Sequence, residues 1–185
     1  MSHVISARSA TSSVHDSHVI SACSVITDVR RLMAHLLTKP TFDRYLLSEG
    51  QVTTFCTFLI EGNWQRSFMD PDETDPAADR AFTPWELVRP YCLSLIKGKR
   101  TPLSFKFVFI FPREDLPDFL KKNEITIPAD NIFGLYLNLS FRDGVLLATT
   151  GTSLRSFSLD KSLDHAWDSY ILSFLEAQGI AAERA

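Results

Sequence analysis

Residues 103–111 constrain the fold more than any other part of this chain. Large apolar side chains occupy the odd-numbered positions of this segment, and they include four phenylalanine rings. Alternation with a period of two is typical of a β-strand, in which successive side chains point to opposite faces of a sheet. Because rings on one face need a thick cover, we predict a strand in the middle of a sheet and beneath helices. The predicted buried row is Leu103, Phe105, Phe107, Phe109 and Phe111.

The composition is that of one globular domain. The chain has 185 residues, of which 45% are hydrophobic and 22% are charged, which is usual for a domain that buries its own core. The net charge of −3 gives no overall attraction to nucleic acid or to anionic membranes. The three cysteines lack the spacing of a metal site, which indicates a reducing compartment. We therefore expect a cytoplasmic protein without a cofactor, a bound metal or a membrane anchor.

The two ends of the chain differ from its centre. Residues 1–23 are rich in Ser, Ala and His, and the sequence Ser-His-Val-Ile-Ser-Ala occurs in them twice. We expect this segment to be a disordered tail or a stretch that is not part of the native protein. Residues 24–179 are expected to form a single domain, in which the acidic segment 70–80 is a mobile loop. Residues 180–185 are expected to be a C-terminal tail.

Periodicity within the domain predicts helices placed between pairs of strands. Asp143-Gly144 and Gly62-Asn63 are typical of hairpin turns, and Thr83 is a predicted helix cap. Strands joined by tight turns predict an α+β fold with a single, largely antiparallel β-sheet and helices packed mainly on one face. The predicted helices cover about 24–37, 84–97, 115–122 and 160–178, and the predicted strands cover 51–61, 64–68, 103–111, 135–142, 145–150 and 153–159.

Several short motifs are spread over roughly residues 28–175. They are Thr-Phe-Cys-Thr-Phe at 54–58 with Glu-Gly at 61–62, Pro-Trp at 84–85 with Arg-Pro at 89–90, the segments 95–102 and 104–106, and the segments 150–154, 159–163 and 166–168. Together these motifs resemble a family of small bacterial proteins that share a domain of unknown function. The resemblance implies a single domain, and it carries no activity, cofactor or catalytic residue.

The turn before the aromatic strand is the strongest candidate for a binding site. Its cations flank a glycine, and cations beside a free backbone can hold a phosphate or a carboxylate. The alternative is structural, because the helix dipole favours lysines at the C-terminal end of a helix. The chain has no GxxxxGK[ST] phosphate-binding motif. The predicted anion-binding residues are Lys97, Lys99, Arg100, Thr101, Lys106 and Arg155.

Two other polar clusters are interpreted as structural. Residues 149–153 are rich in hydroxyl groups around Gly151, and we predict a turn between two strands there. The last predicted helix carries four polar residues away from its apolar stripe, and we expect them to form a solvated helix face. These four residues are Lys161, Asp164, His165 and Asp168.

These patterns predict a binding or interaction domain without catalytic activity. The expected ligand of the basic turn is an anion, which includes a phosphate, a nucleotide, a nucleic-acid backbone and an acidic protein surface. A small enzyme with a dispersed active site is the alternative, and it requires a pocket of about 300 Å³ or more. A homodimer formed through an exposed strand edge or an aromatic patch is a third hypothesis.

Overall fold

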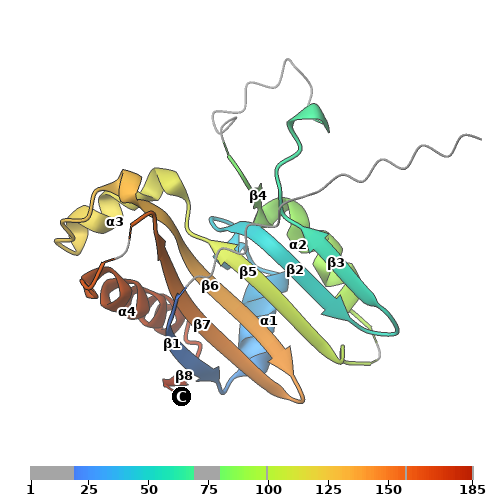
Figure 1. Ribbon diagram of the computed structural model, residues 1–185. Helices are drawn as coiled ribbons and strands as arrows, with labels where there is room; N and C mark the ends of the chain where they lie inside the picture. Colours follow the sequence, from blue (N-terminus) through green and yellow to red (C-terminus); the bar gives the residue numbers. More distant parts are fainter. Residues whose placement is uncertain (1–18, 69–79, 99, 157, 185) are drawn as a thin grey trace, which may run out of the picture.

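The computed structural model describes residues 19–68, 80–98, 100–156 and 158–184. The strands are β1 (Val19–Ile26), β2 (Leu46–Thr53), β3 (Thr57–Glu61), β4 (Thr83–Pro84), β5 (Ser104–Ile110), β6 (Ile132–Arg142), β7 (Val145–Leu154) and β8 (Ala182–Arg184). In these residues they form one antiparallel sheet of eight strands (Figure 1). The spatial order is β3-β2-β5-β6-β7-β1-β8, and β4 pairs with β2.

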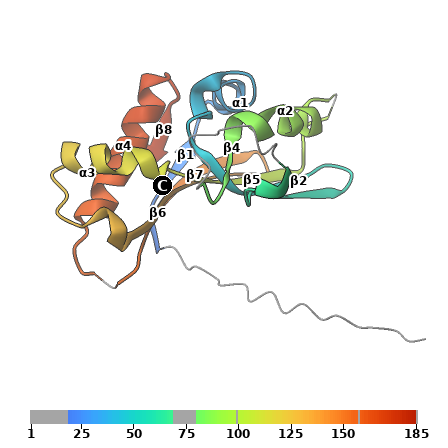
Figure 2. The ribbon, with the colours of Figure 1, turned by 90° about the horizontal axis from the view of Figure 1, so that it is seen from above.

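Helices cover one face of this sheet. They are α1 (Val29–Leu37), α2 (Trp85–Ile96), α3 (Leu116–Lys122) and α4 (Ser162–Ala177). Figure 2 shows α1, α2 and α4 on the same side of the strands, and all of them contribute buried residues to the main core. The α+β class predicted from the sequence is therefore confirmed. Within the described part of the chain, no helix is long and apolar enough to cross a membrane.

The aromatic strand lies where the sequence places it. β5 is paired on both sides, with β2 and with β6, and the four phenylalanines of its odd row are buried in the main core. Phe107 packs edge-on against Trp85 of α2, with ring centroids 5.1 Å apart, and Phe111 packs against Trp167 of α4 at 5.3 Å. The prediction is wrong for Leu103, which is 69% exposed. Leu103 precedes the first residue of β5, outside the layer that the helices cover.

Regular structure extends beyond both expected boundaries of the domain. β1 begins at Val19 and pairs with β7 and β8, so the sheet includes residues from the segment 1–23. The expected tail 180–185 contains β8, in which Ala182 pairs with Ile26. Residues 1–18 and 70–79 of the expected tail and acidic loop lie outside the described residues.

Two predicted helix starts differ from the structure. The first helix begins at Val29 rather than near residue 24, because the preceding residues pair with β7. Asp28 caps this helix, since its carboxylate accepts a hydrogen bond from the backbone N–H of Arg31 at 3.0 Å. Thr83 does not cap α2 as predicted. Its hydroxyl donates instead to the carbonyl of Gly62 at 3.0 Å.

One of the two predicted hairpin turns is confirmed, and the other is wrong. Asp143 and Gly144 join β6 to β7 with positive φ angles of 52° and 81°, as a tight hairpin turn requires. Gly62-Asn63 is not a hairpin turn, because residues 57–61 pair with β2 and the turn lies at 54–56. The predicted break at 149–153 is also absent, since β7 continues through Gly151 to Leu154.

The face of the sheet opposite α1, α2 and α4, which we call the second face, carries a small apolar cluster of its own. Its buried members are Val108, Ile110 and Tyr136, and the partly buried Phe82 packs against them. Strand pairing places Leu46, Ile110 and Tyr136 in one row across β2, β5 and β6. Because these side chains do not belong to the main core, β5 is apolar on both faces at its C-terminal end.

Candidate functional site

The basic turn lies at the N-terminal end of β5, and the structure describes all of its predicted residues except Lys99. Lys97, Arg100 and Thr101 are exposed. They line a groove of about 330 Å³ whose other walls are mainly apolar side chains of α1, α2, β5 and β6. The cations therefore border an apolar groove beside the main core.

The other two predicted site residues lie elsewhere. Lys106 points from β5 toward β2, where its ammonium lies 3.3 Å from the carboxylate of Glu49. Arg155 follows β7, in which Gly151 pairs with Tyr136 and Tyr136 in turn pairs with Ile110 at the end of β5. The length of β5 therefore separates Arg155 from the basic turn, so the predicted set is not one site.

Arg155 lines a larger cavity, of about 690 Å³, which we call the arginine-lined cavity. The row formed by Leu46, Ile110 and Tyr136 contributes to its lining, so the cavity opens on the second face of the sheet. Its volume lies within the range of ordinary ligand pockets. The remaining residues of its lining are Arg80, Ala81, Phe82, Phe111, Arg113, Glu114, Leu116, Phe133, Gly134, Leu135 and Arg155.

Gly134 leaves room for the aromatic ring of Tyr136 at the wall of this cavity. A β-carbon added at Gly134 would lie 3.0 Å from the ring of Tyr136, two residues further along the same strand. That separation is shorter than an ordinary contact between carbon atoms. A side chain at Gly134 would therefore displace the ring of Tyr136 by at least a few tenths of an ångström.

Among the described residues that line the cavity, three guanidinium groups and one carboxylate carry charge. Arg80 lies 3.8 Å from Glu114, and its Nε is buried without a hydrogen-bond partner in the described structure. Arg113 donates to the carbonyl of Ile132 at 3.2 Å. The guanidinium carbon of Arg155 lies 5.8 Å from the centre of the Phe133 ring, within range of a cation–π interaction.

Of these three guanidinium groups, that of Arg155 is the one without a carboxylate partner among the described residues. Among residues 19–68, 80–98, 100–156 and 158–184, no carboxylate lies within ion-pair distance of its guanidinium. Glu114 is the one acidic residue among the described residues of the lining, so these residues carry a local excess of positive charge, although the whole chain has a net charge of −3. This excess favours an anion inside the cavity.

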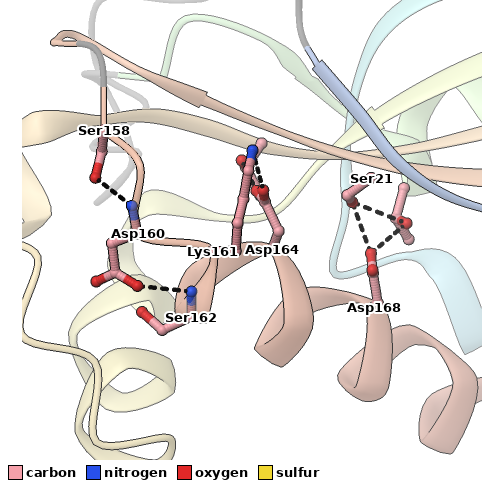
Figure 3. Close-up of polar contacts among 9 residues, drawn as sticks. Ser21, Ser158, Asp160, Lys161, Ser162, Asp164 and Asp168 are labelled. Carbon is pink, nitrogen blue, oxygen red and sulfur yellow. Dashed lines mark hydrogen bonds and ion pairs between the residues drawn. The ribbon is translucent and has the colours of Figure 1, made fainter.

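The second polar cluster of the fold lies between α4 and the sheet (Figure 3). Asp168 is only 8% exposed, and its Oδ1 accepts hydrogen bonds from the hydroxyls of Ser21 at 2.7 Å and Thr150 at 2.6 Å. Asp164, also 8% exposed, accepts one from Thr152 and lies 3.0 Å from the ammonium of Lys161.

The expectation of a solvated helix face is therefore wrong for two of the four residues. Asp164 and Asp168 are one helical turn apart and face the sheet, whereas His165 and Lys161 are exposed. The buried carboxylates accept hydrogen bonds from hydroxyls of β1 and β7, which fixes α4 on these strands. We interpret this cluster as an anchor of the fold.

Sequence reasoning missed the arginine-lined cavity except for Arg155. Its three arginines come from the segment before β4, from the turn after β5 and from the end of β7, so no local motif joins them. One signal was present: Val108 and Ile110 make the second face of β5 apolar, which is unusual for a strand that is covered by helices on one face alone.

These observations define a small α+β domain with a cationic, largely apolar cavity on the second face of its sheet. The chain belongs to the family of unknown function DUF5721, whose model matches residues 35–183. This match confirms the resemblance that the short motifs predict, and it includes all described residues of the cavity lining. No curated protein and no solved structure matches the chain.

Proposed function

We propose that this domain is a binding domain that takes a small organic anion with an apolar body into the arginine-lined cavity. The observation that carries the proposal is the combination of three guanidinium groups with one carboxylate around a mainly apolar wall. Ligand sites are typically concave and apolar, with a few polar groups that fix the orientation of the ligand.

Each part of the cavity has a role in this proposal. The row of Leu46, Ile110 and Tyr136 supports the apolar body of the ligand, and Phe82 closes one side. Arg155 meets the anionic group, because the ring of Phe133 holds its guanidinium plane while its N–H groups have no acidic partner in the described chain.

Octanoate, a carboxylate on an apolar chain, tests this function by isothermal titration calorimetry at low salt. We expect saturable binding that weakens as the salt concentration rises, and weaker binding of the uncharged octanol. The Arg155→Gln substitution removes a charge-assisted hydrogen bond to the carboxylate. The affinity of the variant for octanoate should therefore be at least about tenfold lower than that of the parent protein.

A matched variant makes this test specific. Arg142→Gln removes an exposed arginine at the far end of β6 that does not line the cavity, and it should leave the affinity for octanoate unchanged. Both variants should retain the melting temperature of the parent protein. Equal affinities for the parent and Arg155→Gln proteins would overturn the proposed function, as would failure of both octanoate and an alkyl phosphate to bind.

The basic turn remains a separate predicted anion site. The apolar groove beside Lys97 and Arg100 favours a ligand that combines an anionic group with an apolar one. Alanine substitution of Lys97, Lys99 and Arg100 together should abolish binding of inorganic phosphate or an acidic peptide at this turn. Binding that survives the triple substitution would remove the turn as a site.

A small enzyme is the second candidate function, and the volume of the arginine-lined cavity favours it. The cavity exceeds the 300 Å³ or so that such a site requires, and Glu114 supplies the one carboxylate among the described residues that line it. The two functions differ in what happens to a bound ligand. A binding domain returns the ligand chemically unchanged, whereas an enzyme converts it, and mass spectrometry of the ligand after long incubation distinguishes the two.

A further inference from the structure

We infer that the anionic group of the ligand is a phosphate monoester, received at one end of the cavity by Arg113 and Arg155 together. The inference rests on the proposed function and gives the chemical class of its ligand. Its support is that two of the three cavity arginines are anchored at the same short segment of the chain.

The start of β6 brings the two arginines together. Arg113 donates from Nη1 to the carbonyl of Ile132 at 3.2 Å. The backbone N–H of Arg155 donates to the carbonyl of Asn131 at 2.8 Å, and its guanidinium lies over the ring of Phe133. Three consecutive residues, 131–133, therefore hold both arginines, and each guanidinium has its own fixed support.

The third arginine of the cavity comes from a different part of the sheet. Arg80 precedes β4, which pairs with β2, and its guanidinium lies 3.8 Å from the carboxylate of Glu114. Arg113 has a carboxylate neighbour too, but Asp130 is fully exposed and lies 3.5 Å away. An exposed ion pair of this kind contributes little. The same holds for Arg80, because the carboxylate of Glu114 is also exposed. Arg113 and Arg155 therefore differ from Arg80 not in charge but in their shared support at residues 131–133.

Two guanidinium groups at one end match a doubly charged group better than a singly charged one. A phosphate monoester carries a charge between −1.5 and −2 at neutral pH and offers three acceptor oxygens. Guanidinium groups bind such oxygens in pairs, through parallel N–H donors. A carboxylate has one charge and two oxygens, so it would leave one of the two arginines without a partner.

The apolar row places the rest of the ligand. Leu46, Ile110 and Tyr136 extend from β6 toward β2, away from the arginine pair. An apolar body attached to the phosphate would lie along this row and end near Phe82. Because the body lies inside the cavity, the inferred ligand is a soluble phosphate monoester rather than the headgroup of a lipid that remains in a membrane.

Octyl phosphate and octanoate, each titrated into this 185-residue chain, test this inference. At pH 7.5 octyl phosphate should bind about tenfold more tightly, because it engages both arginines. Its affinity should fall as the pH drops through about 6, where the phosphate takes up a proton. The affinity of octanoate should stay nearly constant between pH 7.5 and pH 6, because a carboxylate remains ionised there.

Variants locate the phosphate. Arg113→Gln and Arg155→Gln should each lower the affinity of the protein for octyl phosphate about tenfold. Arg80→Gln should change this affinity less than threefold. Asp130→Asn, which removes the exposed neighbour of Arg113, should leave binding intact or strengthen it. Vesicles of phosphatidylcholine with phosphatidic acid should not sediment the protein.

The failures of the two proposals differ. If neither ligand binds, the cavity is not an anion site and the proposed function fails. If octanoate binds as tightly as octyl phosphate, with no dependence on pH, the function stands and the phosphate inference is overturned. If Arg80→Gln lowers the affinity as much as Arg113→Gln does, the placement of the phosphate is overturned. If the protein binds vesicles but not octyl phosphate, the inference that the ligand is soluble is overturned.

Discussion

Replacing Asp168 by alanine is expected to destabilise the domain by about 3 kcal/mol. The carboxylate accepts two hydrogen bonds, from Ser21 at 2.7 Å and Thr150 at 2.6 Å, and a hydrogen bond to a charged group contributes about 1.5 to 3 kcal/mol. The lower end applies here, because both donors share one oxygen and the two hydroxyls lie 3.3 Å apart and can bond to each other.

Urea denaturation measures this loss. With a slope of about 2 kcal/mol per molar urea, the midpoint of Asp168→Ala should lie about 1.5 M below that of the parent protein. Asp168→Asn keeps one acceptor oxygen and should lose less than the alanine variant. His165→Ala on the exposed side of α4 should change the stability by no more than about 0.5 kcal/mol. Equal midpoints for Asp168→Ala and His165→Ala would refute the interpretation of this cluster as an anchor.

Three further predictions concern the packing of the domain. Gly62→Ala would place a β-carbon 1.8 Å from a backbone carbonyl of β2. Denaturation followed by circular dichroism should therefore show that the free energy of unfolding falls by more than about 3 kcal/mol, or that the variant does not fold. Cys56 is exposed, whereas burial raises the pKa of Cys92 to about 12. A thiol reagent at pH 8 should therefore modify Cys56 at once and Cys92 only after unfolding. Burial, reinforced by the charge of Lys39, lowers the pKa of His35 below 6.5, so the unfolded chain binds this proton more readily and the melting temperature should fall as the pH drops below about 6.5. A His35→Gln variant should lose that part of the pH dependence.

The parts of the fold that the sequence predicts are those with a strong local period. The aromatic row of β5 alternates over many residues, and the turn at Asp143-Gly144 has a composition that few other structures favour. β1 was missed because its residues Val19–Ile26 follow a tail-like composition and include no clear alternation. Its place in the sheet depends on strands β7 and β8, which lie more than a hundred residues further along the chain.

The buried carboxylates show why part of the polar structure was misjudged. A carboxylate is normally exposed unless it has a partner, and the partners of Asp168 are Ser21 and Thr150, which a local pattern does not connect with it. The arginine-lined cavity was missed for the same reason, because its residues are far apart in the sequence. Arg80, Arg113 and Arg155 come together only because the antiparallel order of the sheet places their segments at one end.

The position of β1 between β7 and β8 bears on how the protein assembles during synthesis. β1 is the earliest described strand to leave the ribosome, yet both of its neighbours follow residue 144. While β2 and β3 can already pair as a local hairpin, β1 has no partner until most of the polypeptide has emerged. An unpaired strand is prone to pair with other chains, so β1 is exposed to aggregation until β7 has been synthesised and pairs with it.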